Sequence, residues 1–192
     1  MKRLWQGIAV VVLFLFVVSC APRHAVLKEP MARPSEGKAL VNFLRPSSTG
    51  AAVTITIWDG EKLIGMPRGK QAFQYECDPG NHLFISWSEF KSPVEAELLP
   101  DRVYYIVLRV RMGWWRMRLH QVPINPHHEL WSDALNWQKT LPNYEFDRAV
   151  LSTIEAEHKD KIREYLQTYE TEIKGTKHVL YLRPEDGVPM EE

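Results

Sequence analysis

The chain of 192 residues has 24 basic and 24 acidic side chains, and 45% of its residues are hydrophobic. This length and composition suit one domain with a core of its own and room for an appendage. A formal net charge of zero, or −2 for residues 20–192 alone, argues against a general nucleic-acid binder.

The first twenty residues fall into three parts. Lys2 and Arg3 are basic, residues 8–18 form an unbroken apolar run, and residues 17–20 read VVSC. An apolar run of eleven residues rises about 16 Å as a helix, whereas the core of a bilayer is about 30 Å thick. The run therefore predicts that residues 1–19 are a signal peptide and not a transmembrane helix.

Residues 17–20 resemble the lipobox of bacterial lipoproteins, in which aliphatic or small residues precede a cysteine. The resemblance implies cleavage between Ser19 and Cys20 and attachment of lipid to the Cys20 sulfur, the nucleophile that takes up the lipid. Several acyl chains anchor a protein stably. Ala21 stands where an Asp would resemble an inner-membrane retention signal, which favours the outer membrane, with the domain facing the periplasm. An uncleaved N-terminal anchor with an incidental cysteine is the alternative.

Residues 20–38 hold three prolines, are polar overall and show no period. This composition predicts a flexible tether that would lift the domain tens of ångströms off the bilayer, at about 3.1 Å per extended residue. With Cys20 lipidated, Cys77 is left alone, so we expect no internal disulfide.

Residues 39–122 predict a β-sandwich domain. Period-two alternation, β-branched residues and turn signals such as Asp59-Gly60 mark its strands. Seven or eight short strands at this spacing are typical of a sandwich. The expected strands cover residues 39–44, 53–58, 62–66, 73–77, 82–87, 94–98, 103–111 and 114–122.

Four motifs in this region are ALVNFLRPSS at 39–48, GEKLIG at 60–65, DPG at 78–80 and DRVYY at 101–105. Together they resemble a family of small bacterial lipoproteins that carries a domain of unknown function. The resemblance covers residues 39–112 and implies a sandwich similar to transthyretin-like or carboxypeptidase-regulatory-like domains. It bears on the fold and implies no catalytic residues.

Residues 123–192 predict a helical extension to the sandwich. Pro123 and Pro126 end the sheet, and apolar residues at three- and four-residue steps follow. We expect a short amphipathic helix over residues 127–141, a long one over 143–174, and a last strand at 179–182.

The hairpin of residues 103–122 holds the main candidate surface. If Met112-Gly113 is its turn, one face gathers basic and aromatic side chains beside Tyr105, namely Arg109, Arg111, Trp114, Arg116, Arg118 and His120. Like charges that lie opposite each other destabilise a sheet, so we expect anionic groups to lie against this arginine face. Lipid headgroups or an acidic partner can supply it, because Arg binds phosphate well. We favour cover by the acidic long helix, since a long amphipathic helix must pack on some surface.

Two other features invite a chemical interpretation. The run His127-His128-Glu129 lacks the spacing that places ligands on one face, so no metal and no other cofactor is predicted. Cys77 shares a strand face with Phe73 and Tyr75, which predicts a buried thiol. A catalytic Cys-His pair stays open, with a histidine that the sequence does not identify.

No catalytic motif appears in the sequence. The expected function is that of a non-catalytic cell-envelope lipoprotein with a structural or protein-interaction role and a possible envelope protein partner. The alternative is a binder of anionic lipid headgroups, or of another small anionic ligand, through the arginine face. An envelope enzyme is a third hypothesis, and the oligomeric state stays open.

Overall fold

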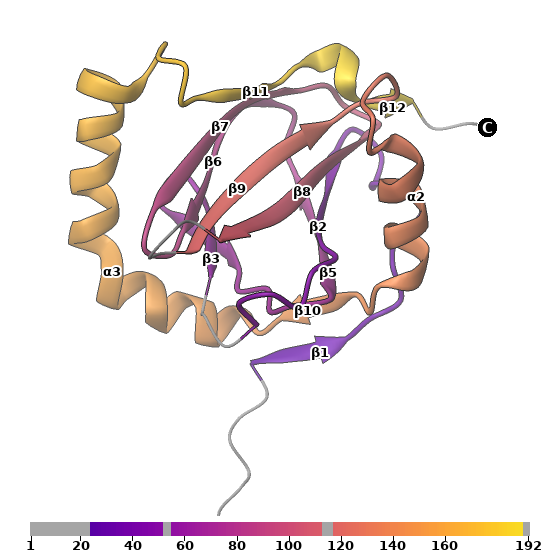
Figure 1. The fold of residues 1–192 in the computed structure, drawn as a ribbon, viewed down its shortest axis with the longest axis horizontal. Coiled ribbons are helices and arrows are strands. Elements are labelled where there is room, and N and C mark those ends of the chain that lie inside the picture. Colours follow the sequence, from indigo (N-terminus) through magenta and orange to yellow (C-terminus); the bar gives the residue numbers. More distant parts are fainter. Residues whose placement is uncertain (1–23, 52–54, 113–116, 190–192) are drawn as a thin grey trace, which may run out of the picture.

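Two five-stranded β-sheets pack face to face, with one helix on the outer face of each (Figure 1). This computed structural model describes residues 24–51, 55–112 and 117–189, and for residues 111–112 and 117–118 it describes the backbone alone. The prediction of a mainly β sandwich with a C-terminal helix is confirmed.

The first sheet has the order β12-β8-β2-β5, and β9 also pairs with β8. Strands β2 and β8 run parallel, whereas the other pairs in this sheet are antiparallel. Its strands are β2 (Ala39–Arg45), β5 (Gln71–Cys77), β8 (Arg102–Met112), β9 (Met117–Ile124) and β12 (Val188–Pro189).

The second sheet has the order β11-β7-β6-β3-β4. Only the pairing of β11 with β7 is parallel. Its strands are β3 (Thr56–Asp59), β4 (Lys62–Gly65), β6 (Gly80–Trp87), β7 (Lys91–Leu98) and β11 (Leu180–Leu182). A separate two-stranded sheet joins β1 (Ala25–Leu27) to β10 (Tyr144–Phe146) in antiparallel fashion.

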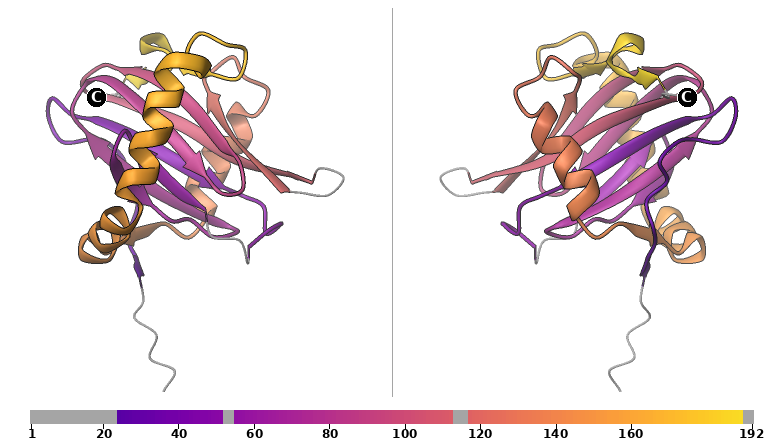
Figure 2. Two further views of the ribbon diagram at one scale, coloured as in Figure 1. Left: turned by 90° about the vertical axis from the view of Figure 1, so that its left-hand side faces the viewer. Right: turned by 90° about the vertical axis from the view of Figure 1, so that its right-hand side faces the viewer.

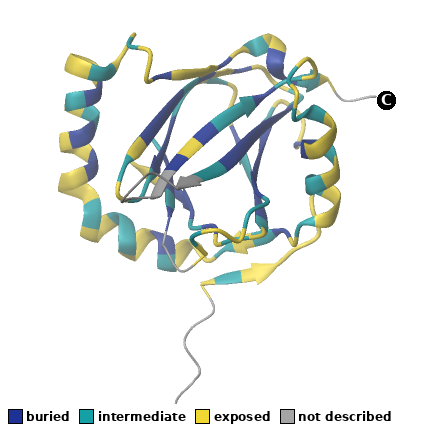
Figure 3. Cartoon of the chain, in the orientation of Figure 1, coloured by how far each residue is buried: buried dark blue, intermediate teal, exposed yellow. Residues whose placement is uncertain are grey.

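The main core lies between the two sheets, where alternate residues of each strand point inward. Phe43 of β2 stacks on Phe73 of β5, with 4.7 Å between ring centroids, and meets Phe84 of β6 edge-on at 5.4 Å. Burial of such a ring stabilises the fold by about 1.5–3 kcal/mol. Every residue of β2 is buried, because the strand has a neighbour on each side and cover on each face (Figure 3).

The helices cover the two outer faces. Helix α2 (Trp131–Thr140) packs on the first sheet, whereas α3 (Arg148–Thr168) and the π-helix η1 (Tyr169–Ile173) that continues it pack on the second. Figure 2 shows α2 and α3 on opposite sides of the sandwich. Among the described residues, no helix combines the length and the apolar character that crossing a membrane requires.

The long helix does not cover the arginine face, and that expectation is wrong. The outer face of the second sheet carries an apolar patch of Trp58, Leu63 and Ile85, against which Leu151 and Ile162 pack. Polar contacts fix the same position, because α3 satisfies the backbone of the edge strand β4. Arg148 Nη1 donates to Leu63 O over 2.7 Å, and Leu63 N donates to Glu155 Oε1 over 2.6 Å.

The residues after 122 contribute strands as well as helices. Strand β11 extends the second sheet beside β7, and β12 pairs with the start of β8 in the first sheet. The 3₁₀-helix η2 (Pro184–Asp186) connects these two strands. The C-terminal part therefore completes the sandwich and is more than a helical extension.

The segment expected to be a free tether is bound to the domain from residue 24. Strand β1 pairs with β10, and three backbone N–H groups beyond it donate to carboxylate or amide oxygens of the sandwich. Met31 N donates to Gln74 Oε1 and Ser35 N to Glu76 Oε2, each over 2.6 Å. The segment has few apolar residues, and this composition is typical of a linker. The groups that bind it lie far along the chain, so the composition of the segment does not reveal them.

Candidate functional site

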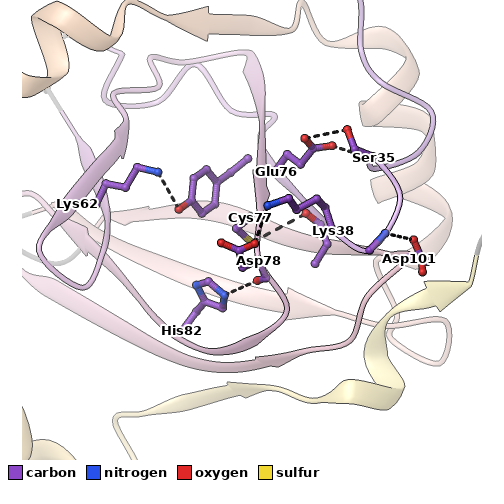
Figure 4. A network of polar contacts seen from close by, with 11 residues as sticks. Ser35, Lys38, Lys62, Glu76, Cys77, Asp78, His82 and Asp101 are labelled. Carbon is purple, nitrogen blue, oxygen red and sulfur yellow. Dashed lines mark hydrogen bonds and ion pairs between the residues drawn. The ribbon is translucent and has the colours of Figure 1, made fainter.

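A cluster of polar side chains lies between the two sheets at one end of the sandwich. Figure 4 shows part of this region, with His82 and Lys38 each in contact with Asp78. Asp59 ends β3 and His82 lies near the start of β6, both at inward-facing positions of the second sheet. Tyr75 and Cys77 lie at inward-facing positions of β5 in the first sheet. The β3–β4 connection turns at Gly60 with a φ of 55°, which a glycine adopts at little cost.

Hydrogen bonds join this cluster across the gap between the sheets. His82 Nδ1 lies 2.8 Å from Asp59 Oδ2, and His82 Nε2 lies 2.9 Å from the carbonyl oxygen of Asp78. Tyr75 donates to the same Asp59 oxygen over 3.0 Å. The side chains of Asp59 and His82 are each only 13% exposed, so a buried carboxylate holds contacts to both sheets.

The electrostatics of the cluster favour a charged histidine. Burial by itself would lower the pKa of His82, but the hydrogen bond to Asp59, the neighbouring Cys77 side chain and the attraction of the Asp59 charge raise that pKa to about 10. Both ring nitrogens face acceptors, which suits an imidazolium that donates from each. Burial, together with the Asp59 charge, also raises the pKa of Tyr75, so its hydroxyl stays protonated and donates.

Two lysines surround the cluster at its solvent-exposed rim. Lys62 Nζ lies 3.4 Å from the Tyr75 hydroxyl and 5.0 Å from the centroid of its ring. Lys38 forms an ion pair with Asp78 over 2.6 Å, next to the carbonyl group that His82 contacts. These exposed contacts add little stability in water. The buried pair of Asp59 and His82 is therefore the main electrostatic interaction of the site.

The prediction of a buried Cys77 beside Phe73 and Tyr75 is confirmed. Cys77 is 8% exposed, belongs to the inter-sheet core, and lies with its Sγ 4.0 Å from the carbonyl oxygen of Ala39. His82 is the histidine that the fold brings near this thiol. Because both of its nitrogens are engaged, this arrangement leaves none to accept a thiol proton. The geometry supports a structural ion pair within the second sheet, which Tyr75 connects to the first sheet, rather than general base catalysis.

Sequence reasoning missed Asp59 and His82 as members of a site. Asp59 was interpreted only as a turn residue and His82 only as the start of a strand. The period-two pattern held a usable signal, because His82 shares the inward face of β6 with the buried Phe84. A titratable residue at a core-facing position of a strand needs a polar partner, so this pattern predicts a buried polar contact.

The β8–β9 hairpin pairs in a different register from the one expected. Arg109 lies opposite His120 and Arg111 opposite Arg118, whereas a turn at residues 112–113 would place Trp114 opposite Arg111. The shift is four residues, an even number, so it does not exchange the two faces of the paired strands. Trp114 and Arg116 lie outside the described residues, as do the side chains of Arg111 and Arg118.

Part of this face is covered by α2. Tyr105 packs edge-on against Trp131, with 5.3 Å between ring centroids, and its hydroxyl donates to Gln138 Oε1 over 2.7 Å. Further along the hairpin, Arg109 is half-buried and His120 is exposed. The structure thus separates an apolar half of the face, which binds α2, from the basic half at the end of the hairpin.

A cavity of about 620 Å³ lies on the outer face of the second sheet, beside η1 and β11. Its wall includes Tyr169, whose hydroxyl donates to Glu95, and burial raises the pKa of that tyrosine. Lys174 in the same wall is paired with Glu170 over 2.8 Å. Within this wall, therefore, Glu95 has a hydrogen-bond donor and Lys174 and Glu170 neutralise each other.

The histidines of the run 127–129 form no metal site. His128 Nδ1 accepts a hydrogen bond of 3.0 Å from the backbone N–H of Leu130. Across the residues that the structure describes, no group of three or more His, Cys, Asp and Glu side chains is arranged to hold a metal ion.

Comparisons with protein-family models, with curated proteins and with solved structures find no match to this chain. The resemblance to a lipoprotein family accordingly stays a prediction. Ser19 and Cys20, the residues on which the predicted anchor depends, lie outside the described residues.

Proposed function

We propose that this chain is a lipid-anchored protein of the bacterial cell envelope, with its lipid on Cys20 in the outer membrane and its domain in the periplasm. The observation that carries the proposal is the short distance along the chain from the lipobox-like residues to the first described contact of the domain. The lipobox-like residues 17–20 are followed by only three residues before His24, whose carbonyl group accepts from Asp147 N over 3.1 Å. The expected cleavage site therefore lies shortly before the first described contact, and every strand that the structure describes lies after it.

Within the envelope, we infer a binding or structural role rather than catalysis. The polar cluster around Asp59 and His82 contains buried titratable groups, and its hydrogen bonds connect the two sheets. A reaction would need a free base or nucleophile at a cavity, and both nitrogens of His82 are occupied. A sandwich with two covered outer faces is suited to presenting loops and edges to an envelope protein partner.

Metabolic labelling with palmitate tests the anchor. We expect label on the wild-type protein and on Cys77→Ser, and none on Cys20→Ser, because only the thiol at position 20 follows the lipobox-like residues. Equal labelling of wild type and Cys20→Ser would contradict the proposal. A pull-down after crosslinking in intact cells, with the anchor retained, then identifies the partner.

A second candidate function is binding of anionic headgroups by the basic half of the hairpin. The observation that favours it is that α3 packs on the other sheet, while the register brings Arg109 opposite His120 and Arg111 opposite Arg118. Like charges at paired positions of a sheet are destabilising unless an anion lies near them.

Vesicle flotation of the unlipidated Cys20→Ser protein tests this second function. We expect salt-sensitive binding to anionic vesicles, and a loss of about tenfold or more when Arg109, Arg111 and Arg118 are all changed to Gln, since each phosphate contact contributes. Changing Lys159 and Lys161 of α3 to Gln removes exposed charge elsewhere and should leave binding unchanged. No binding at low salt would rule this function out.

A further inference from the structure

Strand β1 presents apolar side chains to solvent. Leu27 is 69% exposed and Val26 is 56% exposed, and no other large hydrophobic side chain among the described residues is as exposed as either. Within the described chain β1 pairs only with β10, so its other edge is uncovered. Exposed apolar residues that are adjacent at a sheet edge indicate a contact surface.

The same strand is the part of the domain closest along the chain to the predicted lipid. From Cys20 to Val26 the chain advances six residues, which reach about 22 Å at most when fully extended. Strand β1 supplies no additional slack, because its ends are fixed on both sides. Asp147 N donates to His24 O over 3.1 Å, and Lys28 N donates to Asn143 O over 2.9 Å.

These two facts limit how the domain can sit on a membrane. A lipid on Cys20 holds the sulfur at the boundary between headgroups and acyl chains, and the headgroup region adds only about 6 Å per leaflet. A fully stretched connection would hold Val26 and Leu27 in water near the bilayer, where their exposure has a free-energy cost. A shorter connection brings both side chains into the headgroup region and removes that cost.

The lysine next to β1 is paired with a carboxylate. Lys28, which follows β1, forms an ion pair with Glu145 of β10 over 2.7 Å. The contact therefore depends on apolar burial and on the tether, and it should be insensitive to salt. That property separates it from binding through the arginines, which salt screens.

We propose that the domain rests on the bilayer through the β1–β10 end, with Val26 and Leu27 in the headgroup region. This inference rests on the proposed lipid anchor at Cys20. It also sets the orientation of the rest of the molecule, since Figure 1 places β11 at the opposite side of the sandwich from β1. The cavity beside Tyr181 of β11 then faces away from the membrane.

A pair of fluorescent reporters tests the orientation on the full lipidated protein. In a Cys77→Ser background, Leu27→Cys and Tyr181→Cys each carry an environment-sensitive dye, and the protein is reconstituted into vesicles of phosphatidylethanolamine and phosphatidylglycerol. Tyr181 is a matched control, because it is an apolar side chain of a short edge strand and is 46% exposed. We expect blue-shifted emission at position 27, and quenching by headgroup spin-labelled lipid several-fold stronger than at position 181, at low and high salt alike.

The outcomes separate failure of the orientation from failure of the anchor. Equal, solvent-like emission at both positions, in protein that floats with the vesicles and carries lipid on Cys20, would overturn the orientation and leave the anchor intact. A blue shift at position 27 that spin-labelled lipid does not quench would point to a protein contact on β1 and would overturn it as well. Protein without lipid on Cys20 would refute the anchor and the inference together.

Discussion

The domain should lose stability steadily as the pH rises from about 6.5 towards 10. The pKa of His82 is raised to about 10 in the folded protein, against an ordinary value near 6.5. Within this window the folded state binds a proton that the unfolded state releases, so the free energy of unfolding falls by up to about 1.4 kcal/mol per pH unit. The contribution of His82 is complete below pH 6.5 and is lost above pH 10.

Urea unfolding across this pH range measures the effect, and two variants assign it. His82→Gln removes the titrating group, so its curve should be flatter than the wild-type curve and should approach it near pH 10. Asp59→Asn removes the carboxylate from a pair whose side chains are 13% exposed, and should destabilise the domain by about 3 kcal/mol at pH 6. Lys38→Gln is the control, because its ion pair with Asp78 is exposed. Parallel curves for wild type and His82→Gln would exclude His82 as the source.

Replacing Arg45 with Leu should destabilise the domain by about 3 kcal/mol, through carbonyl groups left without donors. Arg45 is fully buried at the end of β2, and its hydrogen-bond partners among the described residues are carbonyl groups, with no carboxylate. Its Nη1 donates to Pro67 O and its Nη2 to Gly50 O, each over 2.8 Å. One planar guanidinium thus links the β2–β3 connection to the β4–β5 connection. Burial lowers the pKa of Arg45.

Matched variants distinguish these carbonyl contacts from the charge alone. Arg45→Lys keeps a cation but loses the planar fork, so we expect a loss smaller than that of Arg45→Leu but clearly measurable by urea unfolding. Arg163→Leu removes an arginine whose ion pair with Glu61 is half exposed, and should change stability little. An Arg45→Leu protein as stable as wild type would mean that water replaces the guanidinium at all its carbonyl partners.

Most of the strands that sequence analysis found have enough residues to show a period, although the three-residue β11 was also expected, at residues 179–182. Strands β5, β6 and β8 alternate over seven residues or more, and each was expected within a few residues of its ends. Strands β1, β10 and β12 have only two or three residues, too few for any pattern. They form because a partner far along the chain offers hydrogen bonds, as Ala25 finds in Phe146.

The residues of the candidate site also differ in whether a local sequence pattern predicts them. Cys77 was correctly expected inside the sandwich, because its own strand shows the apolar face. Its neighbours Asp59 and His82 come from two other strands, and no local pattern reports which strands become adjacent across a sandwich. The arginine face was predicted because its members are close in sequence, but the register depends on a turn whose length composition does not reveal.

The placement of the last strands has a consequence for how the chain folds. Strand β12 pairs with β8 across more than eighty residues, β11 pairs with β7 across a similar distance, and β1 pairs with β10 across more than one hundred. Pairings between such distant residues close large loops, and chains dominated by them fold slowly. Neither sheet is complete until residues 180–189 have left the ribosome. The region 39–122 therefore lacks strands that the finished sheets contain, and β1 has no partner strand until residues 144–146 have been made.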